Sequence, residues 1–235
     1  MNMTKSTFLV FAAALFVAVT SIASANSLTI TQYGQYSFSD GGEFTVTSAD
    51  AELQAIQSLY NTKAIVNGGF EVFCLEDNQF FKSGASYSYA ISDAAIPGGV
   101  SGGINGRDPV SLGSAWLYSQ FAAGTLANYD YTLGAGRQNS AGLLQKAIWS
   151  LEDEITTETV SNNIFLQAAA TQYGSVNAAK TDNNGSFSVG AINLGNNAEN
   201  QDQIVLRQVP DGGVTIALFG AALLGLGIMR KRFRA

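Results

Sequence analysis

The sequence predicts a single α+β domain of short antiparallel strands, arranged as a sandwich or barrel, with a cluster of helices in its second half. In the precursor, a transmembrane helix is predicted to follow this domain. Three observations support this fold class: alternating apolar and polar segments come first, segments with helical spacing follow, and strand-like segments return at the end. Because strands and helices do not alternate regularly, a βαβ array is not predicted.

The first half is predicted to consist mostly of strands. Short alternating segments separated by glycines predict strands over residues 28–30, 36–38 and 44–46. Ser48 is placed to cap a helix over residues 49–60. The dense apolar run 70–75 predicts a buried strand with 87–91 as its partner, and the glycine-rich residues 97–108 predict a loop.

The second half is predicted to begin with helices. Ser111 is placed to cap a helix that continues through Ala123, and Ser140 to cap a second helix over 141–154, where leucine and isoleucine recur at helical spacing. Residues 163–173 predict a third helix. Two further strands are predicted over residues 187–194 and 203–207. With 235 residues, the chain has room for one such domain and two tails.

Composition excludes several classes of function. The formal net charge of −6 argues against a nucleic-acid partner, which would need a basic face. The chain has no histidine, which removes histidine bases, ligands and proton shuttles. Its one cysteine allows neither an intramolecular disulfide nor a cysteine-based zinc site. We therefore predict no metal, no cofactor and no enzymatic turnover.

The first 25 residues are predicted to be a secretory signal peptide. Lys5 supplies the positive start, residues 8–20 form the apolar run, and Ala23 and Ala25 are the small residues of a cleavage site. The alternative is an ordinary membrane anchor, but the run is short and the cleavage site follows directly. The body would then span residues 26–208.

The predicted C-terminal tail, residues 209–235, has three parts in a fixed order. A turn-forming motif comes first, and it consists of Val209, Pro210, Asp211, Gly212 and Gly213. Residues 214–229 carry no charge, and as a helix they would reach roughly 24 Å, which is short for a bilayer core. A basic end over 230–235 follows, with Arg230, Lys231, Arg232 and Arg234. These basic side chains favour the cytoplasmic side, so the body would lie outside. The alternative is a permanent anchor.

This order of motif, apolar helix and basic cluster resembles the PEP-CTERM class of sorting tails, most closely the VPDSG variant, with Gly212 where that variant usually has serine. The resemblance implies a precursor held transiently in the inner membrane, with its body in the periplasm. Secretion machinery and an exosortase, which cuts near the proline motif, would be its partners. The released body would reach the cell surface or the extracellular matrix of a Gram-negative-type bacterium.

Two segments of the body resemble the signatures of bacterial surface thioester domains. They are Phe73-Cys74-Leu75, within the predicted buried strand, and Leu144-Gln145-x-x-Ile148-Trp149, on a predicted helix. The resemblance implies that Cys74 and Gln145 form an internal thioester with loss of ammonia. An amine on a surface protein or an exopolysaccharide would then attack the bond, giving covalent attachment or adhesion. We expect apolar neighbours to keep the bond dry. Those near the cysteine would be Phe70, Phe73, Leu75, Phe80 and Phe81.

Two alternatives remain open. Cys74 could be an inert, small buried residue in a structural or glycan-associated matrix protein. A glycan-active enzyme would instead use carboxylates, for which Glu152, Asp153, Glu154 and Glu158 are the candidates. We interpret that acidic run as the solvated end of its helix. Lys146 follows Gln145 directly but points about 100° away around the helix, so it is not expected to capture the bond.

Overall fold

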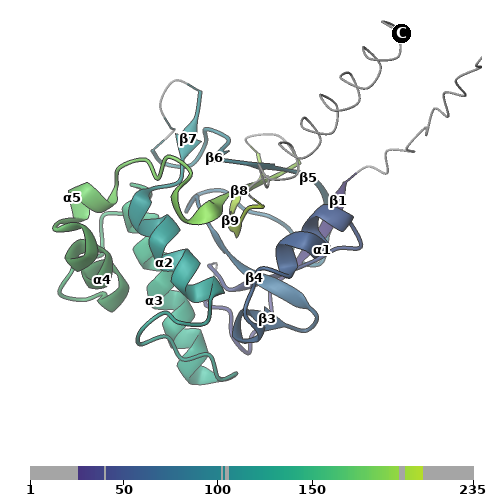
Figure 1. The fold of residues 1–235 in the computed structure, drawn as a ribbon, viewed down its shortest axis with the longest axis horizontal. Coiled ribbons are helices and arrows are strands. Elements are labelled where there is room, and N and C mark those ends of the chain that lie inside the picture. Colours follow the sequence, from purple (N-terminus) through teal and green to yellow (C-terminus); the bar gives the residue numbers. More distant parts are fainter. Residues whose placement is uncertain (1–25, 40, 102, 104–105, 196–198, 209–235) are drawn as a thin grey trace, which may run out of the picture.

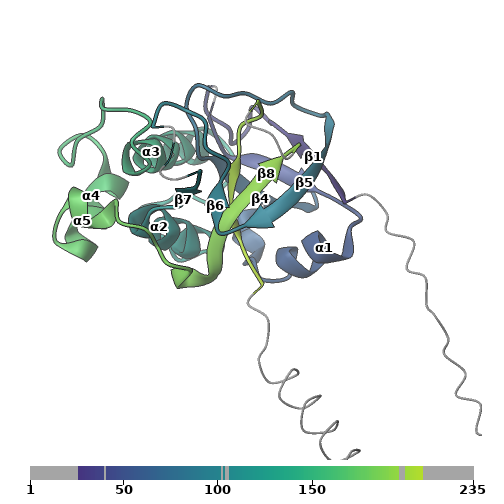
Figure 2. The same ribbon diagram turned by 90° about the horizontal axis from the view of Figure 1, so that it is seen from above.

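The computed structural model of the protein describes residues 26–39, 41–101, 103, 106–195 and 199–208. Strands gather on one side of the body and most helices on the other, as Figures 1 and 2 show. This mixed architecture confirms the predicted α+β fold class. No helix in the described part of the chain is long and apolar enough to cross a membrane. The predicted signal peptide and sorting tail lie outside the described residues.

In the described chain, six strands form a closed antiparallel sheet. Hydrogen-bonded neighbours follow the order β2-β1-β5-β8-β9-β4, and β4 pairs back with β2. Closure leaves these strands without a free edge, which suits an exported body. The six strands are β1 (Ser27–Thr31), β2 (Phe44–Thr47), β4 (Gly69–Cys74), β5 (Ser86–Ser92), β8 (Val189–Leu194) and β9 (Gln203–Leu206). The short strand β3 (Ile65–Val66) extends β4, and β6 (Ala94–Ala95) pairs with β7 (Asp108–Pro109).

The strand register assigns one face of the sheet to the barrel interior. Ile30 lies opposite Val46, and Val46 lies opposite Phe70. Opposed residues share a face and side chains alternate along a strand, so Phe70 and Cys74 point to the same side. Cys74 in turn lies opposite Gln203. The Cys74 side chain therefore belongs to the inner face of the barrel.

The outer face of β4 and β9 is covered by helices. Phe73 lies opposite Ile204, and the Phe73 ring meets that of Phe121 at 5.1 Å between centroids. Helix α2 contacts β8 and β9, whereas α3 contacts β4. The helices are α1 (Ala51–Gln57), α2 (Leu112–Ala122), α3 (Ala135–Leu151), α4 (Ile164–Tyr173) and α5 (Val176–Ala179), with single 3₁₀ turns η1 (Thr62–Ala64) and η2 (Ser186–Ser188).

The helix caps confirm two of the four predicted starts. Ser111 caps α2 and Asn163 caps α4, each accepting backbone N–H groups of the first turn. The prediction for Ser48 is wrong, because Asp50 accepts the N–H of Glu52 at the start of α1. The prediction for Ser140 is also wrong. Helix α3 begins at Ala135, and the Ser140 hydroxyl donates to the carbonyl of Gly136 one turn earlier.

Two strand predictions are also wrong. Residues 36–38 form a turn, because the N–H groups of Tyr36 and Ser37 both donate to the carbonyl of Tyr33. The predicted pairing of 70–75 with 87–91 does not occur, since β4 pairs with β2, β3 and β9, and β5 pairs with β1 and β8. Barrel closure decides these partners, and a local pattern carries no information about it. At residues 187–188, η2 precedes β8.

Candidate functional site

The Gln145 side chain reaches from α3 into the seam between β2 and β4. Phe44 lies opposite Val72 in this ladder, so the same register would place Gly42 opposite Cys74. Instead of this direct backbone pairing, the Gln145 carboxamide lies between Gly42 and Cys74 and bonds to both. Its Oε1 accepts the N–H of Gly42 and the N–H of Cys74, each at 2.9 Å, and its Nε2 donates to the Cys74 carbonyl at 2.8 Å. The fold thus joins the two predicted thioester residues through the backbone of Cys74.

Two glycines allow the carboxamide to enter the seam. A Cβ atom on Gly42 would lie 2.7 Å from the Phe73 ring and 3.1 Å from Gln145 Oε1. On Gly41 it would lie 2.6 Å from Gln145 Cγ. These distances are shorter than ordinary carbon contacts, so a side chain at either position would displace the glutamine. The pair Gly41-Gly42 escaped the sequence analysis, and no local signal distinguishes it from the chain's other glycines.

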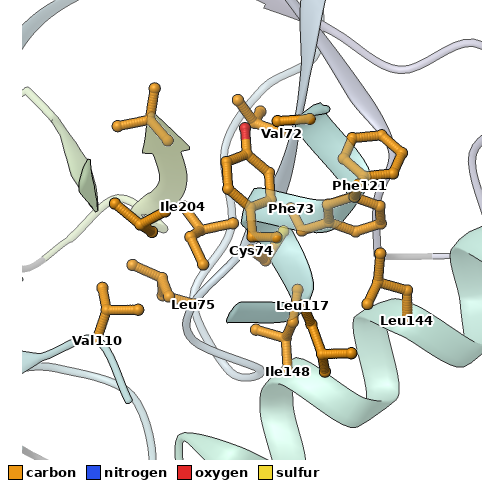
Figure 3. Close-up of a cluster of buried hydrophobic side chains, with 14 of the residues drawn as sticks. Val72, Phe73, Cys74, Leu75, Val110, Leu117, Phe121, Leu144, Ile148 and Ile204 are labelled. Atoms are coloured by element: carbon orange, nitrogen blue, oxygen red, sulfur yellow. The ribbon is translucent and has the colours of Figure 1, made fainter. Parts of the chain in front are cut away.

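Apolar side chains surround the two residues. Cys74 and Gln145 are both fully buried, and Trp149 is 9% exposed. Figure 3 shows Leu144 and Ile148 extending from α3 toward β4. The predicted neighbours are fully or almost fully buried, namely Phe70, Phe73, Leu75, Leu144 and Ile148. Water is therefore excluded from the seam.

The prediction that Phe80 is one of the apolar neighbours of Cys74 is wrong. Its ring is 63% exposed, because the chain has left the barrel by residue 80, where it bridges to Asn200. Phe81 is partly buried and packs edge-on against Phe44, with 4.7 Å between ring centroids. The Lys146 ammonium lies 5.4 Å from the centre of the Phe38 ring.

The carbonyl oxygen of Gln145 is polarised by two hydrogen bonds. Two backbone N–H groups from separate segments converge on one carbonyl oxygen, at distances typical of an oxyanion hole. Burial raises the pKa of the Cys74 thiol well above its ordinary value, and the nearby Glu76 and Asp77 raise it further. A hydrogen bond from Gln203 acts in the opposite direction. The site thus combines a carbonyl that accepts two backbone N–H groups with a neutral, buried thiol on the adjoining strand.

A buried ion pair lies next to this site. Arg137 donates from Nε to Glu43 Oε1 at 2.7 Å and from Nη2 to Glu43 Oε2 at 2.6 Å, and the Tyr129 hydroxyl also donates to Oε1. Burial alone would lower the pKa of Arg137, but the paired Glu43 raises it, so the guanidinium stays charged. The sequence analysis missed this pair because 94 residues separate its members.

The acidic run at the end of α3 is not a solvated helix end throughout. Glu154 is 4% exposed, and its carboxylate accepts the N–H groups of Asp77, Val100 and Ser101. Glu152 accepts both the N–H and the hydroxyl of Ser111. The interpretation as a solvated end is therefore wrong for these two residues, which fasten loops to α3. Within the described ranges, no group of three histidine, cysteine or acidic residues is placed to hold a metal ion.

Comparison with known proteins identifies the tail of the chain. The family model for the VPDSG-CTERM motif matches residues 208–233. No curated protein and no solved structure matches the chain. The tail supports an exported, membrane-transiting precursor that is processed by an exosortase. Because the match lies in the tail, the role of the body depends on the geometry of its own residues.

Proposed function

We propose that the body of this exported protein is a covalent attachment module, in which Cys74 and Gln145 form an internal thioester. One observation carries the proposal. The Gln145 carboxamide is fully buried and hydrogen-bonded to both the N–H and the carbonyl of Cys74. Two of its three hydrogen bonds converge on the carbonyl oxygen that would carry the negative charge during the reaction, and they hold the carboxamide against the backbone of Cys74.

The proposed reaction balances without a cofactor. Cys74 Sγ attacks Gln145 Cδ, and the carbonyl electron pair moves onto Oε1, where the N–H groups of Gly42 and Cys74 stabilise the charge. Collapse of this intermediate breaks the Cδ–Nε2 bond. The thiol proton goes to the departing nitrogen, which leaves as ammonia. A primary amine later attacks the same carbon, forms an amide with Gln145, and returns the Cys74 thiol.

Known energetics make this reaction reasonable in a folded protein. Holding the two groups in contact is worth roughly 7–11 kcal/mol compared with free reactants. A single donor in an oxyanion hole contributes about 2.7–4 kcal/mol. Burial also slows hydrolysis, because water is excluded from the finished bond. The raised pKa of the thiol opposes the reaction, so activation of the carbonyl has to offset it.

The sorting tail indicates where in the cell this chemistry would take place. After processing by the exosortase, the body would meet amines on surface proteins or amine-bearing exopolysaccharides outside the inner membrane. Attachment through Gln145 would be a single-use event and not a turnover reaction. One observation favours a second candidate function: full burial of Cys74 and its raised pKa fit an inert cysteine in a structural or glycan-associated matrix protein.

Intact mass of the purified body separates the two functions. A thioester lowers the mass by one ammonia, and treatment with methylamine replaces that loss with an added amine. Cys74→Ala and Gln145→Ala must both abolish the deficit. Gln138→Ala, which alters a partly exposed glutamine of the same helix, must leave it unchanged. A wild-type body of full mass, with a Cys74 that alkylates on unfolding, would overturn the proposal and leave the inert cysteine.

Sorting through the tail has a separate test. We expect Pro210→Ala, or deletion of the exosortase, to leave uncut precursor in the inner membrane fraction. Unchanged release of the body would contradict processing at this motif.

A further inference from the structure

Gln203 is a polar residue on the inner face of the barrel. It lies directly opposite Cys74 on β9, and both side chains are fully buried. Gln203 also lies opposite Ile192 of β8, and the next residue of β9 on the same face is Val205. Because an apolar side chain would fit these neighbours, the presence of an amide at this position requires an explanation.

The hydrogen bonds of Gln203 direct its amide at the thiol. Nε2 donates to the carbonyl of Gln201 at 3.2 Å and to Cys74 Sγ at 3.7 Å. Oε1 is buried and has no hydrogen-bond partner within the described part of the chain. Leaving a buried carbonyl oxygen unpaired costs about 1–3 kcal/mol. Nε2 is thus held between the Gln201 carbonyl and the Cys74 sulfur.

We propose that Gln203 is a positioning residue for Cys74, which holds the sulfur and stabilises its negative charge during the thioester reaction. This inference rests on the proposed function. A hydrogen bond to a charged acceptor is stronger than one to a neutral acceptor, so the contact strengthens as the sulfur becomes a thiolate. The surroundings oppose that charge, first because Cys74 is buried and then because the acidic Glu76 and Asp77 lie near it.

The same contact acts in both steps of the reaction. When the thioester forms, Sγ gains negative charge as it gives up its proton and attacks Gln145. When an amine captures the thioester, Sγ leaves as a thiolate and passes through a similar charged state. Gln203 would therefore speed both formation and capture while leaving the identity of the amine open.

The test replaces the amide and keeps the volume. Gln203→Met removes the N–H donor with a side chain of similar length, and Gln203→Leu is the second variant should the first fail to fold. Gln201→Met is the matched control, because Gln201 is a buried glutamine that donates to the Glu76 carbonyl and not to Cys74. For each protein, ammonia loss is followed by mass after refolding, and capture by the rate of methylamine addition. We expect both rates to fall about ten- to a hundredfold in the Gln203 variants, and the control to keep them.

A second readout separates this inference from the proposed function. In a Gln145→Ala background no thioester can form, and thiolate absorbance against pH reports the single cysteine directly. Loss of the donor must raise the pKa of Cys74, whereas a purely structural role would leave it unchanged. A wild-type body of full mass, with no ammonia lost, overturns the proposed function. The titration of the Cys74 thiol then tests the role of Gln203 independently. An unchanged thiol pKa in both Gln203 variants overturns the inference.

Discussion

Helix α3 is joined to the barrel by two buried contacts, which involve the adjacent residues Gly42 and Glu43. At the first, Arg137 binds Glu43, and both side chains are at most 2% exposed. At the second, Gln145 binds Gly42 and Cys74. The two contacts share the same helix, the same barrel segment and the same dry surroundings. They differ in charge and in chemistry.

The ion pair satisfies every oxygen that it buries. Both Glu43 oxygens accept hydrogen bonds, so this contact holds the helix and leaves nothing to react. The carboxamide of Gln145 makes three hydrogen bonds, and in the proposed function two of them polarise the carbon that the Cys74 thiol attacks. A charged contact therefore fixes α3, and our proposal assigns chemistry to the neutral contact next to it. Each prediction below separates these two roles.

The largest effect is expected when the ion pair is broken. Arg137→Met leaves the Glu43 carboxylate buried without its partner, which costs about 3–5 kcal/mol in the free energy of unfolding. Chemical denaturation measures this loss. Lys180→Met is the control, because its pair with Asp153 is exposed and is worth at most about 1 kcal/mol. Equal losses in the two variants would show that the buried pair does not hold the helix.

A smaller effect is expected at the glycine beside it. Gly42→Ala places a methyl group 2.7 Å from Phe73 and 3.1 Å from Gln145 Oε1, so we expect a loss of about 1–3 kcal/mol from overpacking. The same change should abolish the ammonia deficit, since it displaces the carboxamide. Gly34→Ala is the matched control, because a Cβ there meets no atom within 4 Å. If Gly42→Ala had the same stability and the same mass deficit as Gly34→Ala, the close packing around Gly42 would be contradicted.

The last prediction concerns pH. Burial and the neighbouring Asp202 raise the pKa of Glu76 to about 9, so the folded protein keeps this proton at neutral pH whereas the unfolded chain releases it. The protonated Glu76 therefore favours folding at low pH, and this contribution to stability is lost as pH rises from about 4.5 toward about 9. Glu76→Gln should flatten this slope in denaturation curves taken at several pH values. A slope as steep as that of the wild type would contradict a protonated Glu76.

Local chemistry accounts for what the sequence predicts correctly. Ser111 was predicted as a cap, and the helix from residue 163 was predicted close to its observed start, because such signals act within one turn of their own helix. The buried strand with Cys74 and the helix with Gln145 were predicted because each carries its own apolar pattern. The partners of β4, the ion pair of Glu43 and the contact of Gln203 depend on residues far apart in the chain. A single sequence holds no signal for such contacts, since they arise only when the barrel closes.

The placement of Gln145 on a long helix has a mechanical consequence. Capture of an amine would join the partner to α3 and release Cys74, so a pull on the partner would reach the body through the helix alone. Arg137 lies two turns nearer the start of the same helix and grips Glu43. Tension entering at Gln145 would thus be resisted by this buried ion pair, and the strength of the attachment would depend on a contact that takes no part in making it.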